Sequence, residues 1–88
     1  MRIIRNNHLM IPLAQLKTGD DATVAAIHAD SALRLRLAGL GFRIGQRVRM
    51  IRKGAFAGPI HVRLGTTDVM LRRRQARQIE VRCTRLAV

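Results

Sequence analysis

Two segments in the middle of the chain alternate strictly between apolar and polar side chains, and this period of two most restricts the fold. In residues 46–53, QRVRMIRK, Val48 and Met50 alternate with arginines, and residues 59–64, PIHVRL, repeat the pattern. Such alternation is typical of a strand with one buried face. The segment KGAFAG at residues 53–58 separates the two, so we predict a hairpin of two paired strands.

The rest of the chain predicts further short elements separated by turn signals. Residues 1–10 are expected to form a loose basic extension, and residues 11–88 a single domain. The expected elements are a helical turn within residues 12–20, a strand over 22–29, a helix over about 31–38, a strand over 68–71, a helical turn over 72–78 and a closing strand over 79–83. With the hairpin, this predicts a mostly β protein with short helices, a small antiparallel barrel of about five strands.

The same alternation predicts which side chains form the core. The expected core residues are Val48, Met50, Ile60, Val62, Leu64, Leu71, Ile79 and Val81, joined by Leu33 and Leu37 from the helix. The polar positions of the hairpin would then share its outer face: Arg47, Arg49, His61 and Arg63. A slip of one residue in strand register would exchange these two sets.

The stretch LAGLGFRIG places three glycines within seven residues, close to the glycine pattern of a dinucleotide site. In such a site the loop follows a strand and precedes a helix, whose N-terminal N–H groups face the phosphate. Here the order is reversed, and the helix would present its partially negative end. We therefore predict structural roles, with Gly39 or Gly41 closing the helix in the left-handed conformation. The residues expected in structural turns are Gly39, Gly41, Gly45, Gly58 and Pro59.

The charge of the chain is strongly positive and unevenly distributed. The 17 basic residues outnumber the 5 acidic ones, which gives a net charge of +12, and the charges of residues 1–30 cancel. A surface of this kind attracts nucleic acid, anionic lipid or an acidic protein face. The chain has no Trp or Tyr, so it lacks the aromatic platforms on which single-stranded nucleic acid stacks. Binding of nucleic acid or the ribosome through phosphates remains the alternative function.

No motif in the sequence indicates catalysis, so we predict a protein that is not an enzyme. Its four aspartates and one glutamate form no evident acid–base pair, and the histidines lack metal-ligand spacing. A metal site could assemble only from distant side chains, among His28, His61, Glu80 and Cys83. His61 and Cys83 are weak candidates within that set. We expect no cofactor, and a divalent metal would be adventitious or shared between molecules.

Three features favour a cytoplasmic location. No apolar run approaches the ~20 residues that span a bilayer. The start, MRIIRNNHLM, lacks the apolar region and cleavage site of a secretory signal. The single cysteine, Cys83, cannot form an internal disulfide, which fits a reducing compartment.

The order of motifs along the chain resembles the FeoA family of bacterial ferrous iron transport accessory proteins. The motifs that carry the resemblance are Leu13, Leu16 and Gly19, then Leu37, Leu40-Gly41-Phe42, Gly45, Val48 and Met50, Gly58-Pro59, Leu71-Arg72-Arg73, Ala76 and Ile79-Glu80-Val81. Together they cover about residues 11–82. Ile44 stands where the family commonly has proline.

The resemblance implies an SH3-like barrel with a role in ferrous iron transport and iron homeostasis. It also implies an association with transition metal ion binding. It also implies that the protein binds or regulates the membrane transporter FeoB, at that partner's cytosolic GTPase region. The protein would then be cytoplasmic and peripheral to the inner membrane through its partner. Self-association as a homo-oligomer is compatible with the sequence.

The arginines are the residues that we expect to contact the partner. A positive face would suit an acidic protein surface beside an anionic membrane. The candidate partner-binding residues are Arg47, Arg49, Arg63, Arg72 and Arg73, and Arg74 and Arg77 would widen the face.

Overall fold

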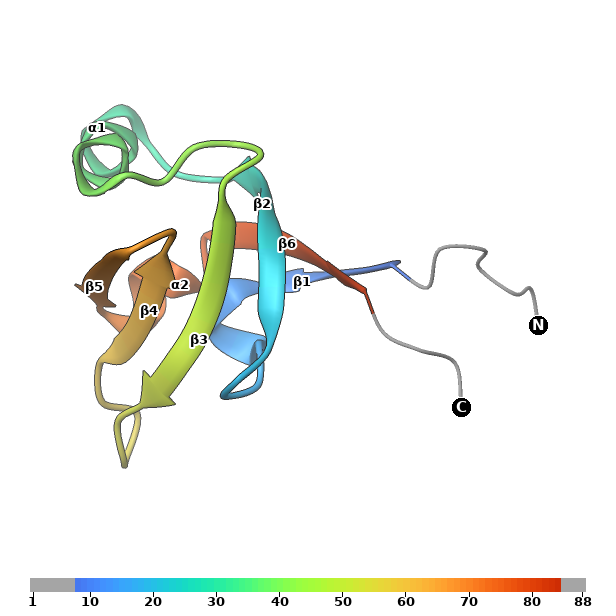
Figure 1. Cartoon of the computed structure of the whole chain (residues 1–88). Coiled ribbons are helices and arrows are strands. Elements are labelled where there is room, and N and C mark those ends of the chain that lie inside the picture. The colour runs from blue at the N-terminus through green and yellow to red at the C-terminus, as the bar shows by residue number, and fades with distance from the viewer. Residues whose placement is uncertain (1–7, 85–88) are drawn as a thin grey trace.

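The computed structural model describes residues 8–84 and forms one six-stranded antiparallel sheet in the order β1-β6-β2-β3-β4-β5 (Figure 1). The strands are β1 (His8–Pro12), β2 (Asp21–Ile27), β3 (Arg47–Lys53), β4 (Ile60–Leu64), β5 (Thr67–Leu71) and β6 (Ile79–Thr84). The helical elements are the 3₁₀ turn η1 (Leu13–Gln15), α1 (Ser31–Leu40) and α2 (Arg73–Ala76). Among the described residues, no helix is long and apolar enough to cross a bilayer.

The sheet curls around a single core, as in a small SH3-like barrel (Figure 1). Strands β1 and β5 are its two edges, and η1 and α2 contact each other. Leu13 and Leu16, in and after η1, and Ala76 of α2 are fully buried. The prediction of a mostly β antiparallel fold with short helices is therefore confirmed, with one strand more than expected.

The predicted core is confirmed in detail. All eight strand residues expected to face inward are buried, as is Leu37 of α1, while Leu33 is partly buried against them. Leu13, Leu16, Val24 and Phe42 complete the centre of the core. The inward face of each strand thus follows from the period of two.

The additional strand is β1, which contains residues that we expected in the extension. His8, Leu9 and Met10 pair with Thr84, Cys83 and Arg82 of β6, so they belong to the sheet. An edge strand is held through backbone hydrogen bonds to one neighbour and needs no alternating pattern. Leu9 and Met10 are both exposed, which explains why the pattern did not reveal this strand. Residues 1–7 of the expected extension lie outside the described residues.

The helix α1 begins and ends as its capping residues dictate. Asp30 Oδ1 accepts a hydrogen bond from the Leu33 N–H at 2.9 Å, which satisfies a free donor of the first turn. Gly41 ends the helix with a φ of 107° in the left-handed region, the conformation that glycine adopts without strain. Of the two glycines considered for this role, Gly41 is thus the cap, and Gly39 lies within the helix.

Candidate functional site

Four charged side chains form a row across the outer face of strands β2 to β5. The register pairs Asp21 with Arg49, Arg49 with Arg63, and Arg63 with Asp68. Two arginines therefore face each other at the centre, an arrangement that destabilises an antiparallel pair when it stands alone. We call these four residues the paired row, because a carboxylate flanks each arginine on its other side.

Both carboxylates of the paired row bind their arginine through two hydrogen bonds. Arg49 donates to Asp21 at 2.8 and 2.9 Å, and Arg63 donates to Asp68 at 2.6 and 3.2 Å. This two-bond geometry is the strongest form of arginine–carboxylate contact. The Arg63 guanidinium lowers the pKa of Asp68 to about 2, and Arg49 lowers the pKa of Asp21. The two ion pairs cancel the charge of the row.

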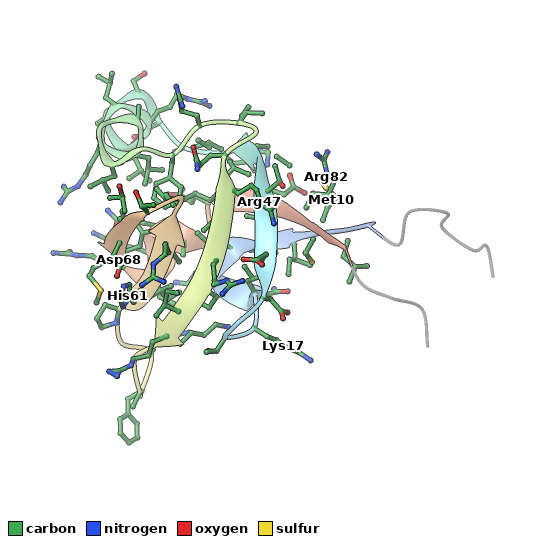
Figure 2. The ribbon with its side chains drawn as sticks, in the orientation of Figure 1. Met10, Lys17, Arg47, His61, Asp68 and Arg82 are labelled. Atoms are coloured by element: carbon green, nitrogen blue, oxygen red, sulfur yellow. The ribbon has the colours of Figure 1, made fainter. Side chains whose placement is uncertain are left out.

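His61 adds a third partner to the carboxylate at the β5 end of the row. Its Nε2 atom lies 3.0 Å from Asp68 Oδ2, and Figure 2 shows the two side chains together on β4 and β5. Asp68 therefore lies between Arg63 and His61. His61 therefore lies beside the Arg63–Asp68 ion pair and carries a charge toward Asp68 only when its imidazole is protonated.

A second row on the same face carries positive charge without a carboxylate. The register pairs Met10 with Arg82, Arg82 with Thr23, and Thr23 with Arg47. Arg47 and Arg82 are exposed, and Met10 is 50% exposed. Figure 2 shows these three side chains at the same end of the sheet. We call Met10, Arg82, Thr23 and Arg47 the open row.

A second basic surface lies around α2, which connects β5 and β6. Its exposed arginines are Arg72, Arg74 and Arg77, which we call the α2 arginine cluster. They line a hollow of about 490 Å³ together with Ala57, Gly58 and Pro59 of the β3–β4 turn. Within the described part of the chain, none of the three forms an ion pair with a carboxylate.

Arg73 differs from its neighbours because it supports the fold. Its Nη2 donates to the Gly54 carbonyl at 3.0 Å, and the side chain is partly buried. Burial and the nearby Arg73 charge also lower the pKa of Lys53 at the end of β3. Arg73 therefore ties α2 to the β3–β4 turn, whereas Arg72 is exposed.

The candidate metal ligands do not come together. His28 Nε2 lies 3.0 Å from Glu80 Oε1, His61 lies beside Asp68, and Cys83 is buried in the core. Across residues 8–84, no group of three or more His, Cys, Asp or Glu side chains is placed to hold a metal. The structure thus gives His28 and His61 carboxylate partners and gives Cys83 a packing role.

The structure separates the five candidate partner-binding arginines into three environments. Arg49 and Arg63 are in ion pairs, Arg47 is in the open row, and Arg72 and Arg73 lie at α2. Sequence reasoning missed Arg82, which the β6 register places in line with Arg47. The alternation of IEVRC, in which Arg82 stands between buried Val81 and Cys83, is the signal that could have identified it.

These features define a class: a small SH3-like β domain whose most distinctive surfaces are positively charged rows and clusters suited to binding. The FeoA domain model matches residues 11–83. The chain belongs to the FeoA family.

The chain is also similar to three known proteins, two of which bear the FeoA or Fe(2+) transport protein A name. The chain is 30% identical over 69 residues to a Porphyromonas gingivalis Fe(2+) transport protein A/Fe(2+) transporter FeoB fusion protein, covering 78% of this chain and 8% of that protein. The solution structure of FeoA from Chlorobium tepidum is 33% identical and has a TM-score of 0.77, covering 83% of this chain and 70% of the other. A manganese-dependent transcriptional repressor is 30% identical with a TM-score of 0.78, covering 86% of this chain and 42% of the other.

Proposed function

We propose that this protein is a non-catalytic, cytoplasmic accessory protein of ferrous iron transport that binds the cytosolic part of an FeoB-type membrane transporter. The observation that carries the proposal is the Porphyromonas gingivalis relative, in which a transport protein A segment and an FeoB transporter share one polypeptide. Fusion holds a domain at a high effective concentration beside its neighbour. We therefore expect the two fused modules to bind each other.

The open row is the part of the outer face best suited to this contact. Within the described residues neither Arg47 nor Arg82 forms an ion pair, and exposed Met10 adds apolar surface in line with them. A charged rim around an apolar contact provides both orientation and specificity at an interface. Arg49 and Arg63 would border the same contact as ordered ion pairs. The partner surface is therefore expected to be acidic.

A co-purification experiment tests the proposal. The tagged chain is expressed at low level with the FeoB-type transporter of the same organism, and membranes are solubilised in a mild detergent at low salt. We expect the transporter to co-purify with the tagged chain and to dissociate as salt rises, because screening weakens contacts between charges. Retention of nucleic acid in place of the transporter, under the same conditions, would favour the phosphate-binding alternative.

The matched control distinguishes a specific contact from general attraction to a basic protein. Arg36 and Arg43 are exposed residues on α1 and in the loop after it. The double variant Arg36→Glu with Arg43→Glu has the same charge change as a double reversal in the open row. It should retain the transporter if the contact is through the outer face. Equal loss in both variants would contradict the assignment of this surface.

A further inference from the structure

The tip of the β3–β4 hairpin carries an aromatic side chain that is fully exposed and packs against none of residues 8–84. Phe56 is 102% exposed, and residues 54–59 include no charged or hydrogen-bonding side chain. Figure 1 shows this hairpin extending past the rest of the sheet. An isolated aromatic ring in water gains nothing for folding, because apolar side chains stabilise a protein only when they are buried.

The backbone at the tip also departs from what stability alone would select. Phe56 and Ala57 have φ values of 54° and 62°, and the Gly58 N–H donates to the Ala55 carbonyl at 3.0 Å. Turns with two central residues at positive φ favour Asn and Gly at these positions. A bulky residue in this region is uncommon and strained, and such strain often marks a functional site.

The tip is held firmly in spite of this strain. The Gly54 N–H donates to the Pro59 carbonyl at 2.8 Å, and Arg73 donates to the Gly54 carbonyl at 3.0 Å. A Cβ on Gly54 or Gly58 would approach a backbone oxygen to 3.0 Å, so the turn is closely packed. The backbone of the turn that carries Phe56 is therefore held in place.

Basic side chains lie beside the base of this apolar tip. The α2 arginine cluster lines the hollow next to residues 57–59, and Arg52 and Lys53 end the β3 arm of the hairpin. An apolar tip next to basic side chains suits an anionic membrane surface, in which a layer of charged headgroups covers the apolar acyl chains. Phe side chains on the apolar face of peripheral proteins are buried at the boundary between headgroups and acyl chains, and basic side chains are attracted to anionic headgroups.

We propose that the hairpin tip is a lipid-contact site that inserts Phe56 into an anionic bilayer surface. The guanidinium groups of the α2 arginine cluster bind phosphate or carboxylate oxygens of the headgroups. A single ring gives weak, reversible binding to a membrane. The α2 arginine cluster supplies the second contribution to the binding free energy that stable peripheral binding requires. This proposal concerns direct binding to lipid and does not depend on the transporter.

Vesicle binding measures the contribution of the ring. The purified chain is sedimented with vesicles of phosphatidylcholine alone or mixed with phosphatidylglycerol, at low salt. We expect binding to the mixed vesicles, and Phe56→Asn should reduce the partition coefficient about tenfold. Asn suits positive φ, so this variant should be at least as stable as the wild type. The control Leu35→Ser removes another exposed apolar side chain, 76% exposed on α1, and should leave binding unchanged.

A fluorescent variant tests insertion independently. The chain has no tryptophan, so Phe56→Trp introduces a single probe at the tip and Leu35→Trp a matched probe on α1. Emission from the Phe56→Trp variant should shift to shorter wavelength with anionic vesicles and be quenched by brominated acyl chains. Emission from the Leu35→Trp variant should not change.

The remaining measurements separate the membrane from other anionic or apolar partners. Arg74→Gln with Arg77→Gln should reduce vesicle binding severalfold at low salt and less at high salt. Vesicle binding that Phe56→Asn leaves unchanged would overturn the proposal, as would an unshifted Phe56→Trp emission. The proposal also fails if Phe56→Asn reduces binding only to single-stranded DNA, or only to the transporter in detergent. If Phe56→Asn loses vesicle binding but retains transporter binding, the result supports the proposal.

Discussion

The outer face of the sheet and the surface around α2 are both rich in arginine, but they hold their charge differently. On the outer face, the strand register places Asp21 beside Arg49 and Asp68 beside Arg63, so half of that face is neutralised. Around α2, the arginine cluster lines its hollow with backbone and small side chains. The number of arginines is thus a poor guide to the charge available for binding, because pairing depends on the register.

The difference also reflects how few carboxylates follow residue 30 in the sequence. Residues 31–88 contain two carboxylates, Asp68 and Glu80. Asp68 binds Arg63 and lies beside His61, and Glu80 lies beside His28. The ion pairs of the described residues therefore leave the cluster without a carboxylate partner, and Asp30 is the carboxylate that lines a neighbouring hollow with Arg74 and Arg77. The open row also contains no carboxylate, because Arg47 and Arg82 flank Thr23.

The largest expected effect tests where the stability of the outer face originates. Val62 is fully buried beneath the paired row, and Val62→Ala should lower the free energy of unfolding by about 1–3 kcal/mol through lost burial and a cavity. That is a large part of the stability of a small domain. Urea denaturation followed by circular dichroism measures it.

The corresponding substitution in the cluster should have almost no effect on folding. Arg74 is exposed, and Arg74→Gln should change the free energy of unfolding by less than about 0.5 kcal/mol. A loss comparable to that of Val62→Ala would mean that the cluster is part of the folding framework. The contrast between the two surfaces would then be lost.

Much of this fold follows from local pattern. The alternation around Val48 and Val62 predicts the inward faces, and the glycines after a leucine-rich helix predict a cap at Gly39 or Gly41, of which the structure uses Gly41. These features could be predicted because they depend on neighbouring residues and on the preference of one backbone conformation. Strand β1 could not be predicted in this way, because Leu9 and Met10 show no alternation at an exposed edge.

The charge pairs could not be read from the sequence for a different reason. Asp21 and Arg49 are 28 positions apart, and their contact depends on how β2 and β3 align. A register shift in β2 between Val24 and Ala26 adds a local irregularity that no periodicity shows. The exposure of Phe56 could not be predicted either, because the segment KGAFAG indicates a turn without fixing the backbone conformation at each of its residues.

The next effect concerns binding through the open row. Arg47→Glu with Arg82→Glu should leave the unfolding transition nearly unchanged, because neither side chain is buried. Transporter binding should weaken about tenfold at low salt, with a smaller loss at high salt. Co-purification at several salt concentrations measures this, with Arg36→Glu and Arg43→Glu as the control pair. Normal binding by the open-row variant at low salt would exclude this surface as the docking site.

A smaller effect of opposite sign should follow from removing the carboxylates of the paired row. Asp21→Asn with Asp68→Asn would release Arg49 and Arg63 and make the outer face uniformly positive. Association with an acidic partner should then strengthen severalfold at low salt, because each freed charge adds to the attraction. Weaker binding would instead indicate that the ordered ion pairs, rather than free charge, form the contact.

The smallest effect is the pH dependence of the Asp68 ion pair. Arg63 lowers the pKa of Asp68 from 3.8 to about 2, so the folded state favours the carboxylate. The resulting stabilisation is fully present above pH 3.8 and is lost as the pH falls toward 2. Its size is limited because both side chains are close to half exposed, where solvent and salt screen the pair. Urea denaturation at low salt should show Asp68→Asn and Arg63→Gln less stable than the wild type at neutral pH. Both differences should shrink in acid, and a difference that persists near pH 2 would show that Asp68 acts through packing instead of charge.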